Sequence, residues 1–527
     1  MNLIAYSILI FYTITLTYIT IYCVMQFHLL YHYKKGKRQA ANSNHASSQG
    51  KRQPSPQLAF AGNQELDAFS DEAPSFDQTN EDLPFVTVQL PIFNEMYVVE
   101  RLIDNIVQFD YPKDRFEIHI LDDSTDETVE ITKRKVQEYQ AKGFNIEQIT
   151  RKKRQGYKAG ALRDATPKAK GEFIAIFDAD FLPRPDFLRQ TIPYFEDPEI
   201  GVVQTRWEHI NEDYSLITRL QALQLNVHFT VEQAGRESGD YLLQFNGTAG
   251  VWRRKTIEDA GGWEADTLTE DLDLSIRAQL KGWKIHFREE IGSPAELPAE
   301  MNGFKSQQFR WMKGGAETAK KMLPAVWKSG LALRQKIQAT FHLLASTVFL
   351  FVFLMGVFSV PLLFLFGELS QSGFRADFFA YFLIGLLSII AVYFVGNVQG
   401  PVHDLPFGKA LVKFLVLFPM FLALSMGLSL HNSVAVLQGY FGKKSPFIRT
   451  PKFNIQSIKD SFAKQQYFSK KISWTTIGEG FLSLYFLVAV VMGIYLQNTT
   501  FIVLHLMLFL GYGAIFYFTL KHVTLKG

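Results

Sequence analysis

Long apolar runs dominate the two ends of the chain, and apolar stretches alternate with polar ones between them. The first run, Leu3 to Leu30, is long enough to cross a bilayer core of roughly 30 Å. Five more runs lie at about 338–366, 376–397, 409–437, 475–496 and 500–520. This pattern predicts a membrane anchor at 1–32, a soluble domain at 83–325 and a multi-span α-helical membrane domain at 337–527.

Basic residues after the first run predict its orientation. Residues 33–38 read Tyr-Lys-Lys-Gly-Lys-Arg, and basic flanks of a membrane span usually stay in the cytoplasm. A cleaved signal peptide is the alternative. The run is too long for one, has no basic residues before it and is followed by no small-residue cleavage site. We therefore expect the N-terminus outside and the soluble domain in the cytoplasm.

A basic loop at 440–473 conflicts with a simple count of crossings. Six plain spans would place this loop outside, although it carries eight Lys and Arg residues, which the positive-inside rule opposes. The run 409–437 contains Pro419 and Gly427 and ends in polar residues. We expect it to be re-entrant, which leaves five full spans and keeps the loop and the C-terminus inside. Six plain spans are the alternative.

The remaining composition narrows the picture further. Residues 37–82 are rich in Ser, Gln, Asn, Ala and Pro, and predict a flexible linker. The net charge of +3 gives no reason to expect a nucleic-acid partner. The single cysteine, Cys23, excludes an intrachain disulfide and a cysteine-based zinc site.

Acidic residues follow two of the predicted strands in the soluble domain. Strands at 85–90, 116–121 and 173–177 alternate with helical stretches, which implies a mostly parallel sheet that binds ligands at the carboxyl ends of its strands. The second strand runs into residues 122–126 (Asp-Asp-Ser-Thr-Asp), where turn and cap chemistry explains Asp126 equally well. The third runs into Asp178-Ala179-Asp180, whose carboxylates can hold a hard cation that neutralises a diphosphate.

A glycine-flanked lysine has two interpretations of equal weight. Lys158 lies in Gly156–Leu162, directly after the basic run Arg151–Arg154. One interpretation is a helix start beside a solvated charge patch. The other is a hinged lysine that reaches an anionic ligand.

Four motifs occur in one order along the chain, D…DxD…TED…QxxRW, formed by Asp123, Asp178 and Asp180, Thr269–Asp271, and Gln307–Trp311. This order resembles the processive branch of the family-two inverting glycosyltransferases, which includes cellulose, hyaluronan and chitin synthases. Several longer phrases are closer to the plant cellulose synthase-like enzymes that make glucomannan or mannan, and to their glucan-making relatives. These phrases span 121–126, 156–162, 176–181, 228–233, 245–250 and 277–284.

The resemblance implies a GT-A, Rossmann-like α/β domain that transfers a hexose with inversion from UDP-glucose or GDP-mannose to the growing end of a β-linked polysaccharide. It assigns the metal, Mg²⁺ or Mn²⁺, to Asp178 and Asp180. It implies catalysis by Asp271 as general base, with Glu270 and Thr269 beside it. The donor-binding residues would be Pro91, Asn94, Glu95, Asp122, Asp123, Lys158, Asp178 and Arg310, and the acceptor-binding residues Gln307, Trp311, Phe245, Asn246 and Gly247.

The implied base agrees with elementary chemistry, because a sugar hydroxyl is a weak nucleophile and needs a positioned proton acceptor. Residues 447–452 (Phe-Ile-Arg-Thr-Pro-Lys) also resemble the Phe-x-Val-Thr-x-Lys loop that closes over the donor in cellulose synthases, with Arg449 in place of Val. That loop would have to be cytoplasmic. A merely basic, membrane-facing loop is the alternative.

The resemblance also implies partners and a location. It predicts an integral protein of the plasma or inner membrane that binds a nucleotide sugar, a polysaccharide acceptor and the lipid bilayer, and leaves export partners open. The main alternative is a non-processive transferase that adds one sugar to ceramide, diacylglycerol or a polyprenyl phosphate. A non-enzymatic membrane scaffold is a second alternative, opposed by acids at every expected position.

Overall fold

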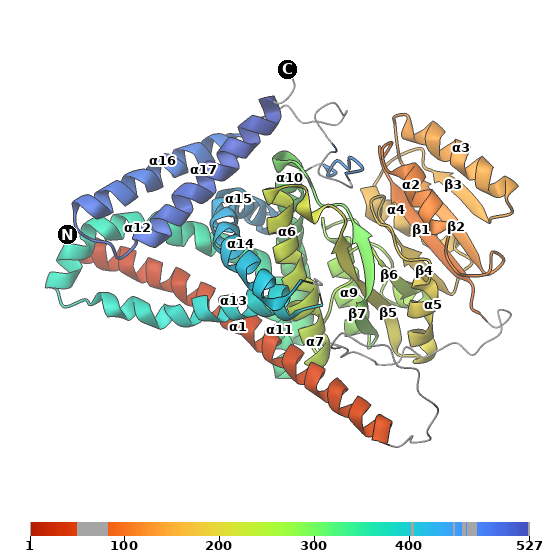
Figure 1. The fold of residues 1–527 in the computed structure, drawn as a ribbon, viewed down its shortest axis with the longest axis horizontal. Coiled ribbons are helices and arrows are strands. Elements are labelled where there is room, and N and C mark those ends of the chain that lie inside the picture. The colour runs from red at the N-terminus through yellow and green to blue at the C-terminus, as the bar shows by residue number, and fades with distance from the viewer. Residues whose placement is uncertain are drawn as a thin grey trace.

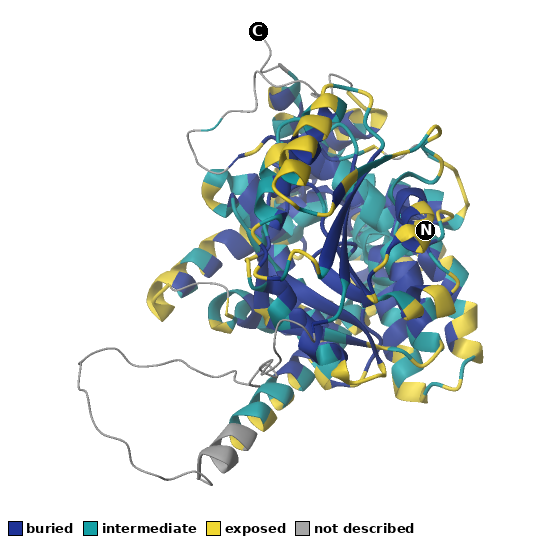
Figure 2. Cartoon of the chain, turned by 90° about the vertical axis from the view of Figure 1, so that its right-hand side faces the viewer, coloured by how far each residue is buried: buried dark blue, intermediate teal, exposed yellow. Residues whose placement is uncertain are grey.

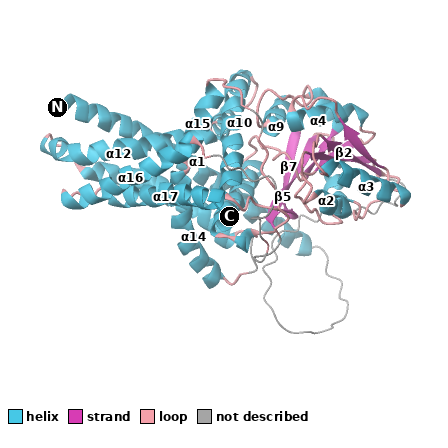
Figure 3. Cartoon of the chain, turned by 90° about the horizontal axis from the view of Figure 1, so that it is seen from above, coloured by secondary structure: helices cyan, strands magenta, loops and turns pink. Residues whose placement is uncertain are grey.

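The computed structural model describes residues 2–49, 83–401, 405–445, 448–455, 460 and 472–524. An α/β domain lies at one side and a bundle of long apolar helices at the other (Figures 1 and 3). The first helix, α1 (Asn2–Gln49), continues well past the predicted anchor. Residues 37–49 of the predicted linker are therefore helical, and the rest of that linker lies outside the described residues.

Seven strands in the described chain form one sheet in the order β3-β2-β1-β4-β6-β5-β7. The strands β3, β2, β1 and β4 are parallel to one another, β6 is antiparallel to both of its neighbours, and β5 pairs parallel with β7. This mixed, mostly parallel arrangement is a GT-A fold, which confirms the predicted fold class. The strands span β1 (Val86–Ile92), β2 (Phe116–Asp122), β3 (Ile146–Thr150), β4 (Phe173–Ile176), β5 (Ile200–His209), β6 (Gly250–Arg253) and β7 (Lys284–Ala295).

Alternating side chains bury both faces of this sheet, and Figure 2 shows its strands enclosed by the surrounding helices. Val88 of β1 packs with Leu102 on one face, whereas Ile174 of β4 packs with Leu162 and Leu274 on the other. Each such side chain contributes ~1.5–3 kcal/mol when it is fully buried. The covering helices are α2 (Val99–Ile106), α3 (Thr128–Ala141), α4 (Tyr157–Ala165), α5 (Phe187–Thr191), α6 (Leu216–Val227), α7 (Ala234–Ser238), α8 (Arg254–Asp259) and α9 (Glu270–Leu280).

Eight further α-helices follow the sheet in the part of the chain that the structure describes. They are α10 (Met301–Lys328), α11 (Leu333–Leu343), α12 (Val348–Gln371), α13 (Leu383–Phe394), α14 (Phe407–Gly427), α15 (Ser429–Tyr440), α16 (Trp474–Tyr495) and α17 (Ile502–Thr524). Within the described residues, six helical segments are long and apolar enough to cross a bilayer: Leu3–Asn42, Ala345–Gln371, Asp377–Gln399, Phe407–Gly427, Trp474–Tyr495 and Ile502–Val523. The chain is therefore an integral membrane protein.

The run 409–437, for which we expected a re-entrant course, consists of α14 and α15. Pro419 lies inside α14, and the chain turns at Leu428 between the two helices. The beginning of α14 and the end of α15 both contact the α/β side of the molecule. Lys413, in the second turn of α14, pairs with Glu212 at 2.7 Å, and the Tyr440 carbonyl at the end of α15 accepts a hydrogen bond from Lys320 of α10 at 2.9 Å.

Candidate active site

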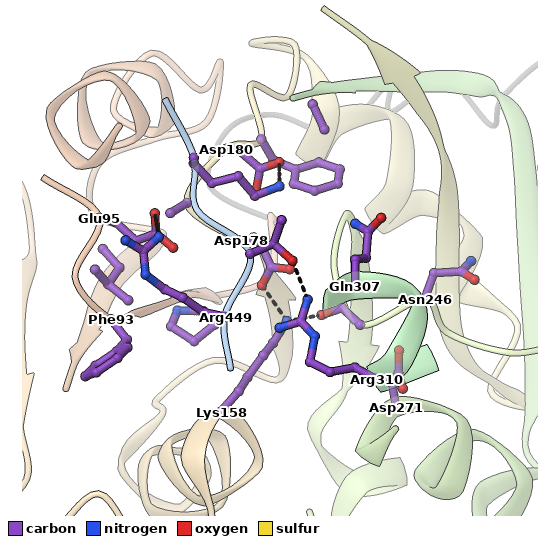
Figure 4. A pocket seen from close by; sticks show the side chains of 18 of the residues that line it. Phe93, Glu95, Lys158, Asp178, Asp180, Asn246, Asp271, Gln307, Arg310 and Arg449 are labelled. Atoms are coloured by element: carbon purple, nitrogen blue, oxygen red, sulfur yellow. Dashed lines mark hydrogen bonds and ion pairs between the residues drawn. The ribbon is translucent and has the colours of Figure 1, made fainter. Parts of the chain in front are cut away.

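A cavity opens at the carboxyl ends of the parallel strands, between the sheet, α9, α10 and the segment 448–455 (Figure 4). All but three of the residues predicted for the site line it. The predicted residues that line the cavity are Pro91, Glu95, Asp123, Lys158, Asp178, Asp180, Asn246, Gly247, Thr269, Glu270, Asp271, Gln307, Arg310 and Trp311. The fold therefore brings together predicted residues from Pro91 to Trp311, which are more than two hundred positions apart in the sequence.

Asp178 and Asp180 lie just beyond β4, at the centre of the cavity. Each carboxylate has an ammonium partner: Lys158 contacts Asp178, and Lys452 lies 2.6 Å from Asp180. Lys158 also donates to the Gly247 carbonyl at 2.9 Å. Of the two interpretations of Lys158, the structure favours a lysine that reaches into a charged site.

These two carboxylates suit a hard divalent cation, which prefers oxygen ligands. Their neighbours are the ammonium groups of Lys158 and Lys452, so a divalent metal ion would share the site with these two side chains. A different acidic cluster, Glu264, Asp266 and Asp273, is also compact, but Lys321 lies 2.6–3.0 Å from all three and none of them lines the cavity. The geometry therefore favours Asp178 and Asp180.

Asp271 lies in the first turn of α9, on the opposite side of the cavity from Phe93 (Figure 4). Its Oδ1 accepts a hydrogen bond from the Leu272 amide at 2.8 Å. Burial, and then the charge of Glu270, raise the pKa of Asp271 to about 7. Burial likewise raises the pKa of Glu270, against the attraction of Lys158. A carboxylate with a pKa near neutrality is suited to accept a proton.

Gly247 lies against Asp271 and has a backbone φ of +82°, which a residue with a side chain rarely adopts. A Cβ atom at this position would lie 2.9 Å from Asp271 Oδ2. Glycine is therefore required for the close approach between this loop and the carboxylate.

Helix α10 carries Gln307, Arg310 and Trp311 on one side, because residues three and four positions apart share a helix face. The Glu300 side chain caps this helix by accepting from the Asn302 amide at 2.9 Å. Trp311 packs against the apolar cluster beneath the sheet, and its remaining surface faces the cavity.

The segment 448–455 covers the donor side of the cavity and contacts three of the predicted residues. Arg449 pairs with Glu95 at 2.9 Å, and Thr450 accepts from Arg310 at 2.9 Å. Burial raises the pKa of Glu95 to about 8, although Arg449 opposes this. This part of the basic loop therefore belongs to the site and is not simply membrane-facing. Phe447 lies outside the described residues.

Three predicted residues do not line the cavity. Asp122 points away from the cavity, because neighbouring residues of a strand point to opposite sides. Its side chain is nearly fully buried and accepts a hydrogen bond from the Ser124 amide at 2.9 Å. Asn94 accepts from the Thr125 amide at 2.8 Å and so ties two strand-end loops together. Phe245 is fully buried, with its ring centroid 5.4 Å from that of Trp252.

Other lining residues were not predicted from the sequence. Most of them end or follow strands, but β3, β5 and β7 were not among the predicted strands, so the rule that found Asp178 could not be applied there. Phe93 follows β1, Arg154 follows β3, Trp207 and His209 end β5, and Glu296 and Leu297 follow β7.

The chain is similar to known glycosyltransferases. Residues 84–314 match the model described as glycosyltransferase like family 2. Glucomannan 4-beta-mannosyltransferase 2 of Arabidopsis thaliana is 44% identical over 245 residues, 46% of each chain, so the match spans about half the length of that relative. The probable glucomannan 4-beta-mannosyltransferase 11 of the same plant is 37% identical over 59% of this chain and 72% of its own. A solved mannosyltransferase from Pyrobaculum calidifontis, in complex with GDP-Man and Mn²⁺, aligns with 81% of this chain and all of its own, at 19% identity and a TM-score of 0.49.

Proposed function

We propose a function from the premise that the chain belongs to glycosyltransferase family 2: it transfers a hexose from a nucleotide sugar to the end of a β-linked, mannan-like or glucan-like polysaccharide. The observation that carries the proposal is the placement of Asp178 and Asp180 opposite Asp271 across one cavity. The names of the two Arabidopsis relatives, both glucomannan mannosyltransferases, favour mannose as the transferred sugar and GDP-mannose as the donor.

In the transfer step, an acceptor hydroxyl attacks the anomeric carbon on the face opposite the diphosphate. The new carbon–oxygen bond forms as the bond to the phosphate oxygen breaks, and Asp271 takes the hydroxyl proton. The electron pair leaves with the nucleoside diphosphate, whose growing charge Lys158 and Arg310 stabilise. An α-linked donor then gives a β-linked product.

A divalent cation, Mg²⁺ or Mn²⁺, would be held by Asp178 and Asp180 and would neutralise the diphosphate as a Lewis acid. Lys452, from the segment 448–455, adds a positive charge beside Asp180. On the acceptor side, Trp311 offers an apolar ring face on which a pyranose can lie, and Gln307 and Asn246 offer hydrogen bonds to hydroxyl groups.

The membrane arrangement that fits this site has the catalytic domain in the cytoplasm. Arg449 and Lys452 contact Glu95 and Asp180, so the loop that carries them must lie on the same side of the membrane as the cavity. The outer ends of the α14–α15 segment contact that side as well, which supports a re-entrant course between five full spans. A plasma or inner membrane, with the polymer passed outward, fits this orientation.

The test is a product assay on the full chain in nanodiscs. With Mn²⁺ and GDP-mannose or UDP-glucose, we expect release of the nucleoside diphosphate and a polymer that β-mannanase or β-glucanase degrades. A single-sugar lipid as the only product would overturn the polymer claim and favour the lipid-transferase alternative. No release from either donor would overturn the transferase assignment itself.

A further inference from the structure

Arg154 belongs to the basic run after β3, and its side chain enters the cavity. Its guanidinium carbon lies 3.3 Å from the centre of the Phe93 ring and 4.9 Å from that of Tyr157. Arg154 Nε is 3.9 Å from Asp123, too far for a hydrogen bond. A planar cation therefore lies on an aromatic face at the edge of the cavity.

Three neighbouring strands place these groups together. Phe93 follows β1, Asp123 follows β2 and Arg154 follows β3, and these strands are adjacent and parallel. Asp123 is fixed by Arg151, which lies 2.5 Å from one carboxylate oxygen and 2.9 Å from the other. This corner of the cavity thus combines a flat ring, a fixed carboxylate and a guanidinium.

The hydrogen-bonding capacity of Arg154 is largely unused. Its Nε is buried and has no hydrogen-bond partner among the described residues. Burial lowers the pKa of Arg154, with the attraction of Asp123 as the first opposing effect, and leaves a guanidinium that stays charged at neutral pH. By contrast, the Arg151 guanidinium donates hydrogen bonds to Asp123 and to two backbone carbonyls.

We infer that Arg154 selects a guanine nucleotide as the donor, an inference that rests on the proposed nucleotide-sugar function. Guanine presents O6 and N7 side by side, a pair of acceptors that matches the two parallel donors of a guanidinium. Uracil lacks N7, and adenine places an amino group where guanine has O6, so neither base accepts the bidentate contact.

The ring face and the carboxylate complete the recognition. The guanine base takes the position of the guanidinium on Phe93, and the guanidinium moves to the O6–N7 edge of the base. The opposite edge carries the N1–H and N2–H donors, for which Asp123 is an acceptor. The donor class is thus a GDP-linked sugar, in agreement with mannose as the transferred unit.

The experiment measures equilibrium binding of GDP, UDP, ADP and 7-deaza-GDP to the full chain in nanodiscs with Mn²⁺. The variants are Arg154→Ala and Arg154→Lys, the second of which keeps the charge and loses the fork. Lys153→Ala is the matched control, because it removes one positive charge from an exposed neighbour outside the cavity. All variants must first match the wild type in elution profile and thermal unfolding.

We expect the wild type to bind GDP roughly tenfold more tightly than UDP, ADP or 7-deaza-GDP, the discrimination typical of one bidentate contact. Both Arg154 variants should lose this preference while UDP binding stays within about twofold of wild type. Lys153→Ala should keep it.

Equal weakening of GDP and UDP would overturn the inference, because Arg154 would then act on the diphosphate that both share. Unchanged GDP binding in both Arg154 variants would also overturn it. A wild type that binds none of the nucleotides would reject the proposed function and the inference together. A wild type with Arg154-dependent GDP selectivity but no polymer product would reject only the polymer proposal.

Discussion

The two halves of the cavity treat their carboxylates differently. On the donor side, Asp178 and Asp180 each contact an ammonium group, from Lys158 and Lys452. On the transfer side, Asp271 forms no ion pair with any described residue and is held by a backbone amide. Carboxylates that already face cationic groups are suited to hold a divalent cation and, through it, a diphosphate, whereas an enclosed carboxylate without an ion pair takes up a proton near neutral pH.

The charged residues of the donor half come from distant parts of the chain. The donor-side acids follow β4, a central strand of the sheet whose four residues are all buried. One of their partners, Lys452, comes from a segment more than 270 residues later, next to the membrane helices. The site therefore depends on the docking of that segment on the domain, and changes there should affect donor binding more than the transfer step.

The largest expected effect is that of Asp271→Asn. This variant keeps the shape of the side chain but cannot accept the hydroxyl proton, so turnover should fall by roughly 10²–10⁴-fold. Initial rates of nucleoside diphosphate release measure it. A rate within a few-fold of wild type would show that another group is the base.

Gly247→Ala should have the next largest effect. The added methyl group would lie 2.9 Å from Asp271 Oδ2 at a backbone φ of +82°, so the base must shift by a few tenths of an ångström. Misplacement of a catalytic group of this kind costs on the order of tenfold or more in rate. The rate should fall while donor binding changes little. The matched control is Gly442→Ala, which also has a positive φ but nothing within 4 Å of its Cβ position.

The pH dependence gives a smaller but more specific effect. The pKa of Asp271 is raised to about 7, so the active carboxylate is lost as the pH falls through this value, and kcat/KM should decline below about pH 7. Glu270→Gln removes the negative charge that helps to raise this pKa, so the decline should begin at a lower pH. If Glu270→Gln leaves the acid limb in place, a different group controls it.

Arg449→Ala should give the smallest effect. Arg449 holds the segment 448–455 on the domain through Glu95, and the variant leaves the contacts of Thr450 and Lys452 in place. We expect the KM for the donor to rise by about 2–5-fold with kcat nearly unchanged, as for the loss of one partly buried ion pair. A loss of kcat without a change in KM would place Arg449 in the transfer step.

Much of this site could be predicted from the sequence, because the carboxyl ends of parallel strands meet at the same edge of a sheet and ligands bind there. That rule identified Asp123, Asp178 and Asp180, whereas Asp271 and α10 required a resemblance, since their contacts join distant parts of the chain. The rule failed for Asp122, because strand residues alternate in direction. It also did not show that Arg154 would turn onto Phe93, which depends on the packing of two loops.

The fold, like the site, could be predicted from the sequence only in part. The order of apolar runs predicted the α/β domain and the helical membrane domain. The helical residues 37–49 were missed because Ser and Asn in this stretch are weak helix formers, and the continuous helix α1 before them extends into it. The contacts of α14 with the α/β side, such as that of Lys413 with Glu212, were not predicted, because hydropathy does not encode them.

The division of the site into a donor half and a transfer half can be tested with one pair of variants. Donor affinity and single-turnover transfer are measured for Asp271→Asn and Asp178→Asn in the same nanodisc preparation. We expect Asp271→Asn to bind the donor like the wild type but to transfer the sugar at least about 100-fold more slowly, whereas Asp178→Asn should lose donor affinity. Transfer by Asp271→Asn at the wild-type rate, or undiminished donor binding by Asp178→Asn, would contradict this division.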